Sequence, residues 1–282
     1  MKYKFMRFPE GKTKAVTFSY DDNGMSDIRM REVFDKYGLK GTFNVMSYSI
    51  GVEGRPSTDN LKEAIANGHE IALHGAHHAA LGNLRPIDGI KEVLECRQVV
   101  ENALGRIVRG YAYSDSGIGK MLNGASYSDI KQYLSDLDIA YARAISGDND
   151  RFLIPSDWHA WMPTAHHTNP GIMKMIEKFV SMDVNKCYCG ERQPRLFFVW
   201  GHSFEFDNNN NWELLDEICE GLSGHEDTWY ASNIDIYDYA TAYDRLVWSV
   251  DNKRVYNPSL MPVWFDVDGK LYCVKSGETL EL

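Results

Sequence analysis

Residues 14–37 read KAVTFSYDDNGMSDIRMREVFDKY, an apolar run followed by a polar turn and a helix-like stretch. The apolar run Ala15–Tyr20 is typical of a buried strand, and Asn23-Gly24 is a turn signal. Ser26–Tyr37 has a helical pattern, and Gly38 supplies the left-handed residue that commonly ends a helix. This stretch therefore predicts a strand–turn–helix unit.

The same kind of unit recurs along the chain, without a detectable sequence repeat. Further strands are predicted at Gly41–Met46, Glu70–Leu73, Ile107–Ala112, Ala140–Ile145, Leu196–Trp200 and Thr228–Ser232. Further helices are predicted at Thr58–Asn67, Ile87–Leu104, Tyr127–Leu137, Gly171–Asp183 and Asn211–Leu222. Strands that alternate with helices favour a parallel sheet, and about seven of them are enough to curl it into a barrel.

The predicted fold class is α/β, a distorted (β/α)7-type barrel with a short C-terminal β-hairpin appendage. We place the barrel at residues 1–250 and the appendage at residues 251–282. The sequence VWFDVDGKLYCV at residues 263–274 contains two strand-like runs around an Asp-Gly turn, which is a hairpin signal. We expect this hairpin to pack on the barrel and not to form a separate domain.

Composition and charge restrict the class of protein. The chain has 282 residues, of which 44% are hydrophobic, enough to bury a sizeable core. A net charge of −10 without any cluster of Lys and Arg argues against nucleic acid or an anionic membrane as a partner. We detect no signal peptide and no segment that could span a bilayer, and the five cysteines lack disulfide spacing. These features predict a cytoplasmic protein with free thiols.

Two carboxylates, Asp21 and Asp22, follow the first strand directly. Within a strand, adjacent side chains point to opposite faces, but at a strand's end the backbone turns and both can reach one site. Taken alone, the pair also fits a solvated turn that caps the helix beginning near Ser26.

Two histidines, His74 and His78, follow the strand Glu70–Leu73 in the string His-Gly-Ala-His-His. On a helical turn, residues four apart face the same way at about 5–6 Å, which lets two imidazoles reach one cation. His77 points elsewhere on such a turn and is assigned no metal role. The alternative is a His-rich surface turn, which the second polar cluster at a strand end makes less favoured.

Two further polar residues lie within or just after predicted strands. The strand position of Arg109 would bury the aliphatic part of its side chain. A buried guanidinium needs a carboxylate partner, and Asp21 and Asp22 are the candidates. His202 follows a fully apolar run and would otherwise be a packed histidine satisfied by Glu205 or Asp207. Barrel enzymes build their active sites from polar residues at the carboxyl ends of parallel strands, which favours a catalytic site here.

These residues resemble the motifs of the polysaccharide deacetylase family, the NodB-homology or carbohydrate esterase family 4 enzymes, in order from about Lys14 to about Tyr239. The family's Thr-Phe-Asp-Asp is similar to Thr17–Asp22, with two more residues before the carboxylates. Its His-(Ser/Thr)-x-x-His is similar to His74–His78, with Gly75 in place of the hydroxyl residue. Its Arg-x-Pro-Tyr resembles Arg109–Tyr113 without the proline, and its Leu-x-Leu-x-His resembles Phe198–His202.

The resemblance implies a role for each matching residue. Asp22, His74 and His78 would be the metal ligands. Asp21 would be the general base, Arg109 would hold Asp21, and His202 would be the general acid. A backbone N–H near Tyr111 or Tyr113 would bind the oxyanion. The family's Asp-x-x-Asp-Trp, which tunes the acid, has two candidate counterparts, Asp148–Asp150 and Asp157-Trp158.

The implied reaction is removal of an N-acetyl group from an amino sugar or an oligo- or polysaccharide, a hydrolysis of a non-peptide C–N bond. A site of two histidines and one carboxylate suits one divalent transition metal, with zinc as the default and Co, Ni, Mn or Fe as alternatives. Substrate contacts are predicted from Tyr111, Tyr113, Trp158 and Trp161, although the tryptophans fit a core position equally well. A second metal pair at His166-His167 is not expected, because adjacent side chains diverge.

Two other functions remain open at the level of the sequence. One is a hydrolase of another amide or of an O-acetyl ester on the same scaffold, since the motifs depart from the family pattern. The other is a non-catalytic carbohydrate-binding protein. The retention of both carboxylates, of Arg109 and of the three histidines His74, His78 and His202 argues against it.

Overall fold

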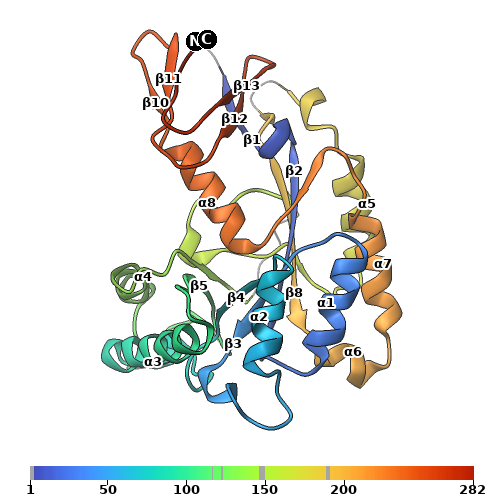
Figure 1. Cartoon of the computed structure of the whole chain (residues 1–282), viewed down its shortest axis with the longest axis vertical. Helices are drawn as coiled ribbons and strands as arrows, with labels where there is room; N and C mark the ends of the chain where they lie inside the picture. The colour runs from blue at the N-terminus through green and yellow to red at the C-terminus, as the bar shows by residue number, and fades with distance from the viewer. Residues whose placement is uncertain (1–2, 116, 122, 146–149, 189–190) are drawn as a thin grey trace.

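The computed structural model describes residues 3–115, 117–121, 123–145, 150–188 and 191–282. Its centre is a curled parallel sheet surrounded by helices, with a smaller β-structure at the end that carries both termini (Figure 1). Among these residues, no helix is both long and apolar enough to cross a membrane. The described cysteines Cys96, Cys187, Cys219 and Cys273 are free thiols, as predicted.

The parallel sheet has the order β6-β5-β4-β3-β2-β8-β7, and β9 pairs with β2 outside this path. Its strands are β2 (Lys14–Asp21), β3 (Gly41–Val45), β4 (Glu70–Leu73), β5 (Gly110–Ala112), β6 (Tyr141–Arg143), β7 (Ala165–His166), β8 (Arg195–His202) and β9 (Thr228–Tyr230). Every residue of β2 is buried, because β2 pairs with three strands and is covered on both faces.

The segment Trp161–His166 connects the two edges of this sheet. Trp161 pairs in parallel with Arg143 at the end of β6, and its N–H donates to the carbonyl of Ala142. Four residues later β7 pairs with β8. The sheet thus curls toward closure, and the predicted distorted (β/α)7-type barrel is confirmed.

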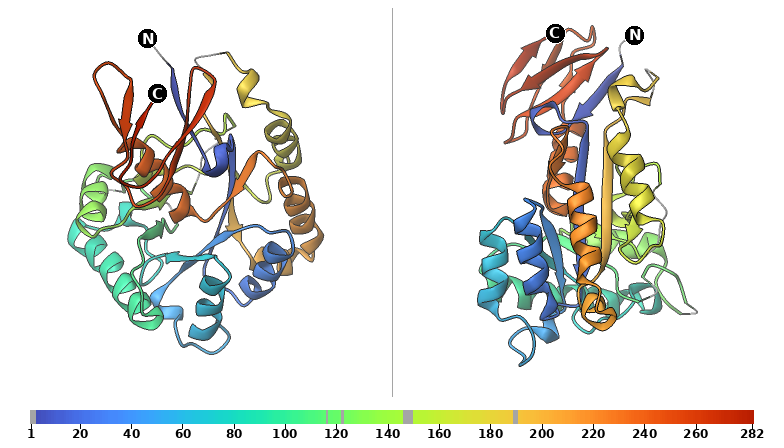
Figure 2. Two further views of the ribbon diagram at one scale, coloured as in Figure 1. Left: turned by 45° about the horizontal axis from the view of Figure 1, so that its top comes forward. Right: turned by 90° about the vertical axis from the view of Figure 1, so that its right-hand side faces the viewer.

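The helices lie around the outside of the sheet (Figure 2). They are α1 (Ser26–Lys36), α2 (Thr58–Ala66), α3 (Pro86–Leu104), α4 (Tyr127–Asp136), α5 (Ile172–Ser181), α6 (Phe204–Asn209), α7 (Trp212–Leu222) and α8 (Asn233–Asp244). Ser57, Ser126 and Ser232 begin α2, α4 and α8 with capping boxes, so local hydrogen bonds fix where these helices start. Gly105 ends α3 in the left-handed conformation.

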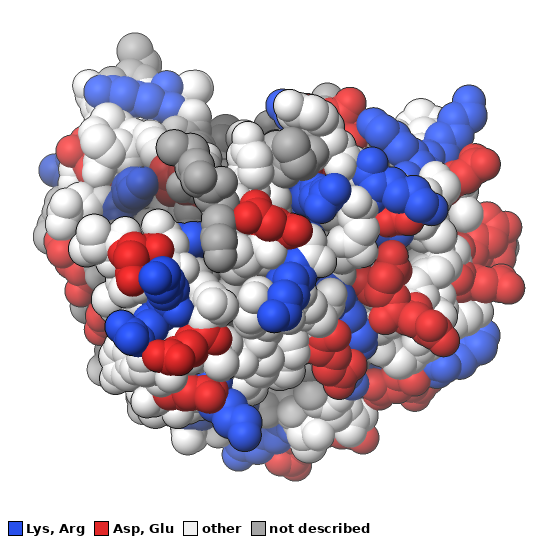
Figure 3. Space-filling view, turned by 90° about the horizontal axis from the view of Figure 1, so that it is seen from above, with Lys and Arg blue, Asp and Glu red and all other residues white. Residues whose placement is uncertain are grey.

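The smaller β-structure is built from both ends of the chain. The predicted hairpin forms as β12 (Val263–Val267) and β13 (Lys270–Val274), and β12 also pairs with β1 (Lys4–Arg7). A second small sheet contains β10 (Val247–Trp248), β11 (Arg254–Tyr256) and β14 (Thr279–Glu281). Seen from this end, positive and negative side chains are intermingled on the surface (Figure 3).

Candidate metal centre

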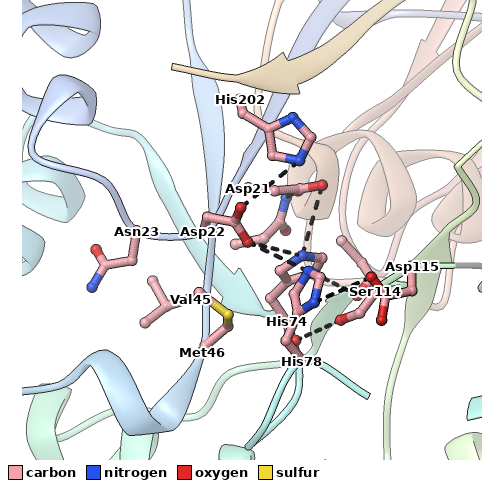
Figure 4. A network of polar contacts seen from close by, with 12 residues as sticks. Asp21, Asp22, Asn23, Val45, Met46, His74, His78, Ser114, Asp115 and His202 are labelled. Carbon is pink, nitrogen blue, oxygen red and sulfur yellow. Dashed lines mark hydrogen bonds and ion pairs between the residues drawn. The ribbon is translucent and has the colours of Figure 1, made fainter. Parts of the chain in front are cut away.

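The candidate centre lies at the carboxyl ends of three parallel strands of one sheet, β2, β8 and β4. Asp21 ends β2, His202 ends β8, and His74 directly follows β4. In Figure 1 the arrowhead of β8 points away from the end of the molecule that carries both termini. Figure 4 shows the carboxylate of Asp22 between His202 on one side and His74 and His78 on the other.

Asp22, His74 and His78 each offer a ligand atom, and these three atoms lie within 4.8 Å of one another. The Nε2 atoms of His74 and His78 are each 3.5 Å from Oδ1 of Asp22. Oδ1 of Asp22 and Nε2 of His74 are both buried without a hydrogen-bond partner. Such atoms are costly unless something binds them, and the donor set of two imidazoles and one carboxylate suits a transition metal.

Second contacts fix the imidazole of His74 in the form that a metal requires. Nδ1 lies 2.9 Å from the carbonyl of Ala112, which only accepts, so Nδ1 carries the proton and Nε2 keeps a free lone pair. Burial, the largest influence, lowers the pKa of His74 and keeps the ring neutral. The hydroxyl of Ser114 holds the same residue by donating to the His74 carbonyl at 2.9 Å.

The loop that carries both histidines is not the helical turn that we predicted. Gly75 and His78 have φ angles of +86° and +60°, in the left-handed region that a right-handed helical turn excludes. The carboxylate of Glu92 accepts the N–H groups of His77 and Ala79 and so holds the loop in this conformation. The imidazole of His77 also contacts Glu92, in agreement with the prediction that it faces away from the metal ligands.

Asp21 is buried, and the arginine that contacts it is Arg143 at the end of β6. Nη2 of Arg143 pairs with Oδ2 of Asp21, and Nδ2 of Asn44 donates to Oδ1 at 2.8 Å. Burial alone would raise the pKa of Asp21, but the charge of Arg143, then those of His74 and His202, and the Asn44 hydrogen bond lower it overall. Asp21 is therefore held as an anion beside the three potential ligands.

Our assignment of this contact to Arg109 was wrong. Arg109 precedes the first residue of β5 and lies at the amino end of the strand, where it forms a two-point ion pair with Asp238 of α8 at 2.6 and 3.0 Å. Arg143 is the last residue of a strand, and the strand-end rule that identified the other site residues could have found it.

His202 lies between two carboxylates. Its Nε2 is 3.9 Å from Oδ2 of Asp22, and its Nδ1 is 3.2 Å from Oε1 of Glu205. Burial alone lowers the pKa of His202, but the hydrogen bond to Glu205 and the charges of Asp21 and Asp22 outweigh it and raise the pKa. The imidazole is thus stabilised in its cationic, proton-donating form.

A second group of potential ligands, His166, His202 and Glu205, also has its atoms within 4.8 Å of one another. The N–H of Thr168 donates to Nδ1 of His166, which places the proton of this ring on Nε2, 3.4 Å from Glu205. His167 reaches the same carboxylate at 3.0 Å, so the adjacent histidines converge and do not diverge as predicted. Glu205 therefore accepts from imidazole N–H groups, an arrangement that orients His202 without a metal.

The structure contradicts the predicted substrate contacts. Tyr111, Tyr113 and Trp161 are at most 1% exposed and belong to the core. The hydroxyl of Tyr113 donates to the carbonyl of His159, and its N–H donates to the carbonyl of Arg143, so this N–H is not available to an oxyanion. Trp158 packs against Tyr237 of α8 at the opposite end of the barrel.

The two predicted counterparts of the acid-tuning motif do not contact His202 where the structure describes them. Asp157 accepts from Tyr127 and Lys131 at 2.7 and 2.8 Å, and Asp150 contributes its carbonyl to Lys178. Asp148 lies outside the described residues. The carboxylate that contacts Nδ1 of His202 is Glu205, which the sequence had offered as the partner of a packed histidine.

Residues 8–133 match the polysaccharide deacetylase family. The predicted resemblance is confirmed, and the match supports a carbohydrate deacetylase or esterase activity. No curated protein sequence matches the chain.

Solved structures with the same fold include a putative polysaccharide deacetylase from Mycobacterium smegmatis, with 16% identity over 86% of this chain and 96% of that one and a TM-score of 0.57. The Xyl-CE4 domain of a xylanase from the hindgut metagenome of Trinervitermes trinervoides is 14% identical over 82% and 92%, with a TM-score of 0.51. Puue allantoinase is 12% identical over 82% and 91%, with a TM-score of 0.56. At these identities, the likeness to these three solved structures shows the fold alone.

Proposed function

We propose that this chain is a metal-dependent hydrolase that removes an N-acetyl group from an amino sugar or from an oligo- or polysaccharide. The observation that carries the proposal is the pair of buried, unpartnered ligand atoms on Asp22 and His74, which face each other beside His78. The polysaccharide deacetylase match over residues 8–133 supports the acetylated carbohydrate as substrate.

Asp22, His74 and His78 would hold the metal, with zinc as the first candidate and Co, Ni, Mn or Fe as alternatives. A bound metal ion at such a site lowers the pKa of water and polarises a carbonyl. Since the three residues supply only three ligand atoms, positions remain for water and for the acetyl oxygen.

Asp21 would accept the proton of the attacking water. Arg143 and Asn44 hold its carboxylate, so the acceptor is ionised and fixed in direction. The lowered pKa of Asp21 keeps this carboxylate ready to accept a proton through the neutral pH range.

His202 would donate a proton to the departing amine. The amine of an amino sugar is a poor leaving group unless it is protonated, and the pKa of His202, which lies near Asp22, is raised. Glu205 directs Nδ1, which leaves Nε2 of His202 on the side of the metal ligands.

The test measures acetate release from N-acetylated glycosides and from O-acetylated xylan side by side, together with metal content. We expect about one equivalent of metal and release from the N-acetylated substrate. Asp21→Asn should retain the metal and lose activity by about 10²–10⁴-fold. Asp251→Asn, an exposed carboxylate of the smaller β-structure, serves as control.

Two outcomes would overturn the proposal. One is full activity of the Asp21→Asn protein on every substrate tested. The other is a metal-replete protein that binds no transition metal, which would favour a carbohydrate-binding protein. Release from xylan alone would assign the same residues to an O-acetyl esterase.

A further inference from the structure

The loop between β3 and α2, residues 46–57, supplies none of the proposed ligands but contacts both segments that do. The N–H groups of Ser47 and Tyr48 donate to the carbonyls of Gly75 and Ala76, inside the loop from His74 to His78, at 3.3 and 3.4 Å. From its other end, Arg55 reaches the turn after β2. This connecting loop therefore joins two ligand-bearing segments that are far apart in sequence.

Arg55 is bound to the backbone of a ligand residue. Its Nη1 donates to the carbonyl of Asp22 at 2.7 Å and to the carbonyl of Asn23 at 3.3 Å. The side chain of Asn23 donates to the hydroxyl of Ser49 at 2.9 Å, and Ser49 donates to the carbonyl of Met46 at 2.7 Å. Asn23 and Ser49 are buried, so the turn is tied to the connecting loop at two points.

The turn needs such restraint because of its backbone conformation. Asp22 and Asn23 have φ angles of +79° and +49°, a region that residues other than glycine enter at a cost. A conformation of this kind persists only where surrounding contacts determine it. The φ angle of Asp22 also sets the direction of its carboxylate toward His74 and His78.

We propose that Arg55 is a positioning residue that holds Asp22 in its ligand conformation and so sets the affinity of the site for its metal. The inference rests on the proposed function, because Asp22 must be a ligand for Arg55 to act on the metal. Nη1 of Arg55 contacts the carbonyls of Asp22 and Asn23 together, so one side chain holds both left-handed residues of the turn. Outer contacts that orient metal ligands commonly change metal affinity by about 10–100-fold when they are removed.

The experiment compares the unsubstituted protein with Arg55→Ala, Arg55→Lys and Arg195→Ala. Arg195 also donates to a backbone carbonyl, that of Glu191, but it begins β8 at the end of the strand opposite His202. Zinc affinity is measured by competition with a chromophoric chelator, and the visible spectrum of the Co²⁺-loaded protein reports the ligand geometry. Metal-free stability is measured by chemical denaturation.

Arg55→Ala should bind zinc about 10–100-fold more weakly and change the Co²⁺ spectrum. The zinc affinity of Arg55→Lys should fall between those of Arg55→Ala and the unsubstituted protein, because the ammonium keeps a positive donor but its flexible stem holds that donor less firmly in place. Arg195→Ala should bind zinc like the unsubstituted protein. With saturating metal, Arg55→Ala should recover most of its kcat.

Equal zinc affinity and equal Co²⁺ spectra for Arg55→Ala and the unsubstituted protein would overturn this inference while leaving the proposed function intact. The inference would also be overturned if Arg195→Ala lost as much zinc affinity as Arg55→Ala, because both losses would then come from general destabilisation of the fold. If the unsubstituted protein binds no metal, the proposed function itself fails.

Discussion

His202 is the residue in which charge and geometry are most closely linked. A carboxylate faces each of its ring nitrogens, Asp22 at Nε2 and Glu205 at Nδ1, and together they raise its pKa against the effect of burial. The imidazoles of His166, His167 and His202 in turn hold the pKa of Glu205 well below its usual range although burial opposes this. Glu205 therefore remains ionised wherever His202 has to act as an acid.

Glu205→Gln should move the basic limb of the pH–rate profile to lower pH. The substitution removes the negative charge that stabilises protonated His202, so the pKa of His202 falls and the acid is lost earlier as pH rises. The acidic limb, which reports Asp21, should move much less. The profile of kcat/KM from pH 5 to 9, measured on the metal-saturated protein, checks this expectation.

Glu213→Gln, an exposed position on α7, controls for the change of net charge. A basic limb that stays in place in the Glu205→Gln protein would show that another group supplies the proton.

Among the elements, the loop from His74 to His78 depends most on one glycine. A Cβ atom at Gly75 would lie 2.7 Å from Oε1 of Glu92, the atom that accepts from the N–H groups of His77 and Ala79. Its φ of +86° adds a backbone cost for any other residue. This explains why glycine replaces the hydroxyl residue of the family motif at this position.

Gly75→Ala should therefore weaken both metal binding and the fold. We expect a loss of about 1–3 kcal/mol in the free energy of unfolding, together with a lower zinc affinity. Gly224→Ala is the matched control, since Gly224 has a φ of +74° with open space around its Cβ position. If both variants lose the same stability and keep zinc affinity, the contact with Glu92 has no role in the site.

The strands and helices of the barrel could be predicted because their signals are local. The predicted strand Glu70–Leu73 is β4 with the same bounds, and the strand at Ala15–Tyr20 extends by one residue at each end. β1 was missed because its partner β12 lies near the other end of the chain, and four residues carry no pattern of their own. Ser232 with Asp235 was a capping signal for α8 that we did not use.

The site was predictable in its residues and less so in its contacts. Asp22, His74 and His78 come together, but through left-handed backbone at Asp22 and His78 that no helical spacing describes. The choice between Arg109 and Arg143 depends on which end of a strand each residue occupies, and a shift of the β5 boundary from Ile107 to Gly110 reverses it. The conformation of the ligand loops and the arginine partner of Asp21 therefore depend on tertiary contacts, which local sequence patterns do not describe.

At the scale of the whole molecule, Glu70 joins separate parts of the barrel at the end opposite the metal ligands. Its carboxyl group accepts from Thr42 of β3, Tyr141 of β6 and the N–H of Ile234 in the first turn of α8, each at 2.9 Å. Burial, the largest influence, raises the pKa of Glu70 from 4.5 to about 7 although these hydrogen bonds oppose it. The folded chain therefore binds this proton more tightly than the unfolded chain does.

The raised pKa of Glu70 makes the stability of the fold depend on pH in a direction that can be measured. Between about pH 4.5 and 7 the unfolded chain has lost the Glu70 proton and the folded chain retains it, so the stability contributed by this group falls as pH rises. The full effect is about 3 kcal/mol or less. Glu70→Gln should remove this part of the pH dependence. Measured against the unsubstituted protein at the same pH, the free energy of unfolding of the variant should therefore be higher at pH 8 than at pH 4.5.

Urea unfolding of both proteins from pH 4.5 to 8 measures the difference between their free energies of unfolding. Groups that both proteins share cancel in this difference, among them Asp27, whose pKa burial also raises to about 7. A constant offset between the two curves across this range would contradict the raised pKa of Glu70.

The pairing of β2 with β8 has a consequence for how the protein is made. Lys14 lies beside Arg195 and Asp21 beside His202, so the strand that ends in Asp21 leaves the ribosome long before its partner strand exists. Parallel pairing between segments so distant in sequence closes slowly, and a domain of this kind completes its fold as a unit. A nascent chain that ends before β8 has its proposed base and lacks its proposed acid, so the proposed hydrolysis can begin only after synthesis has passed His202.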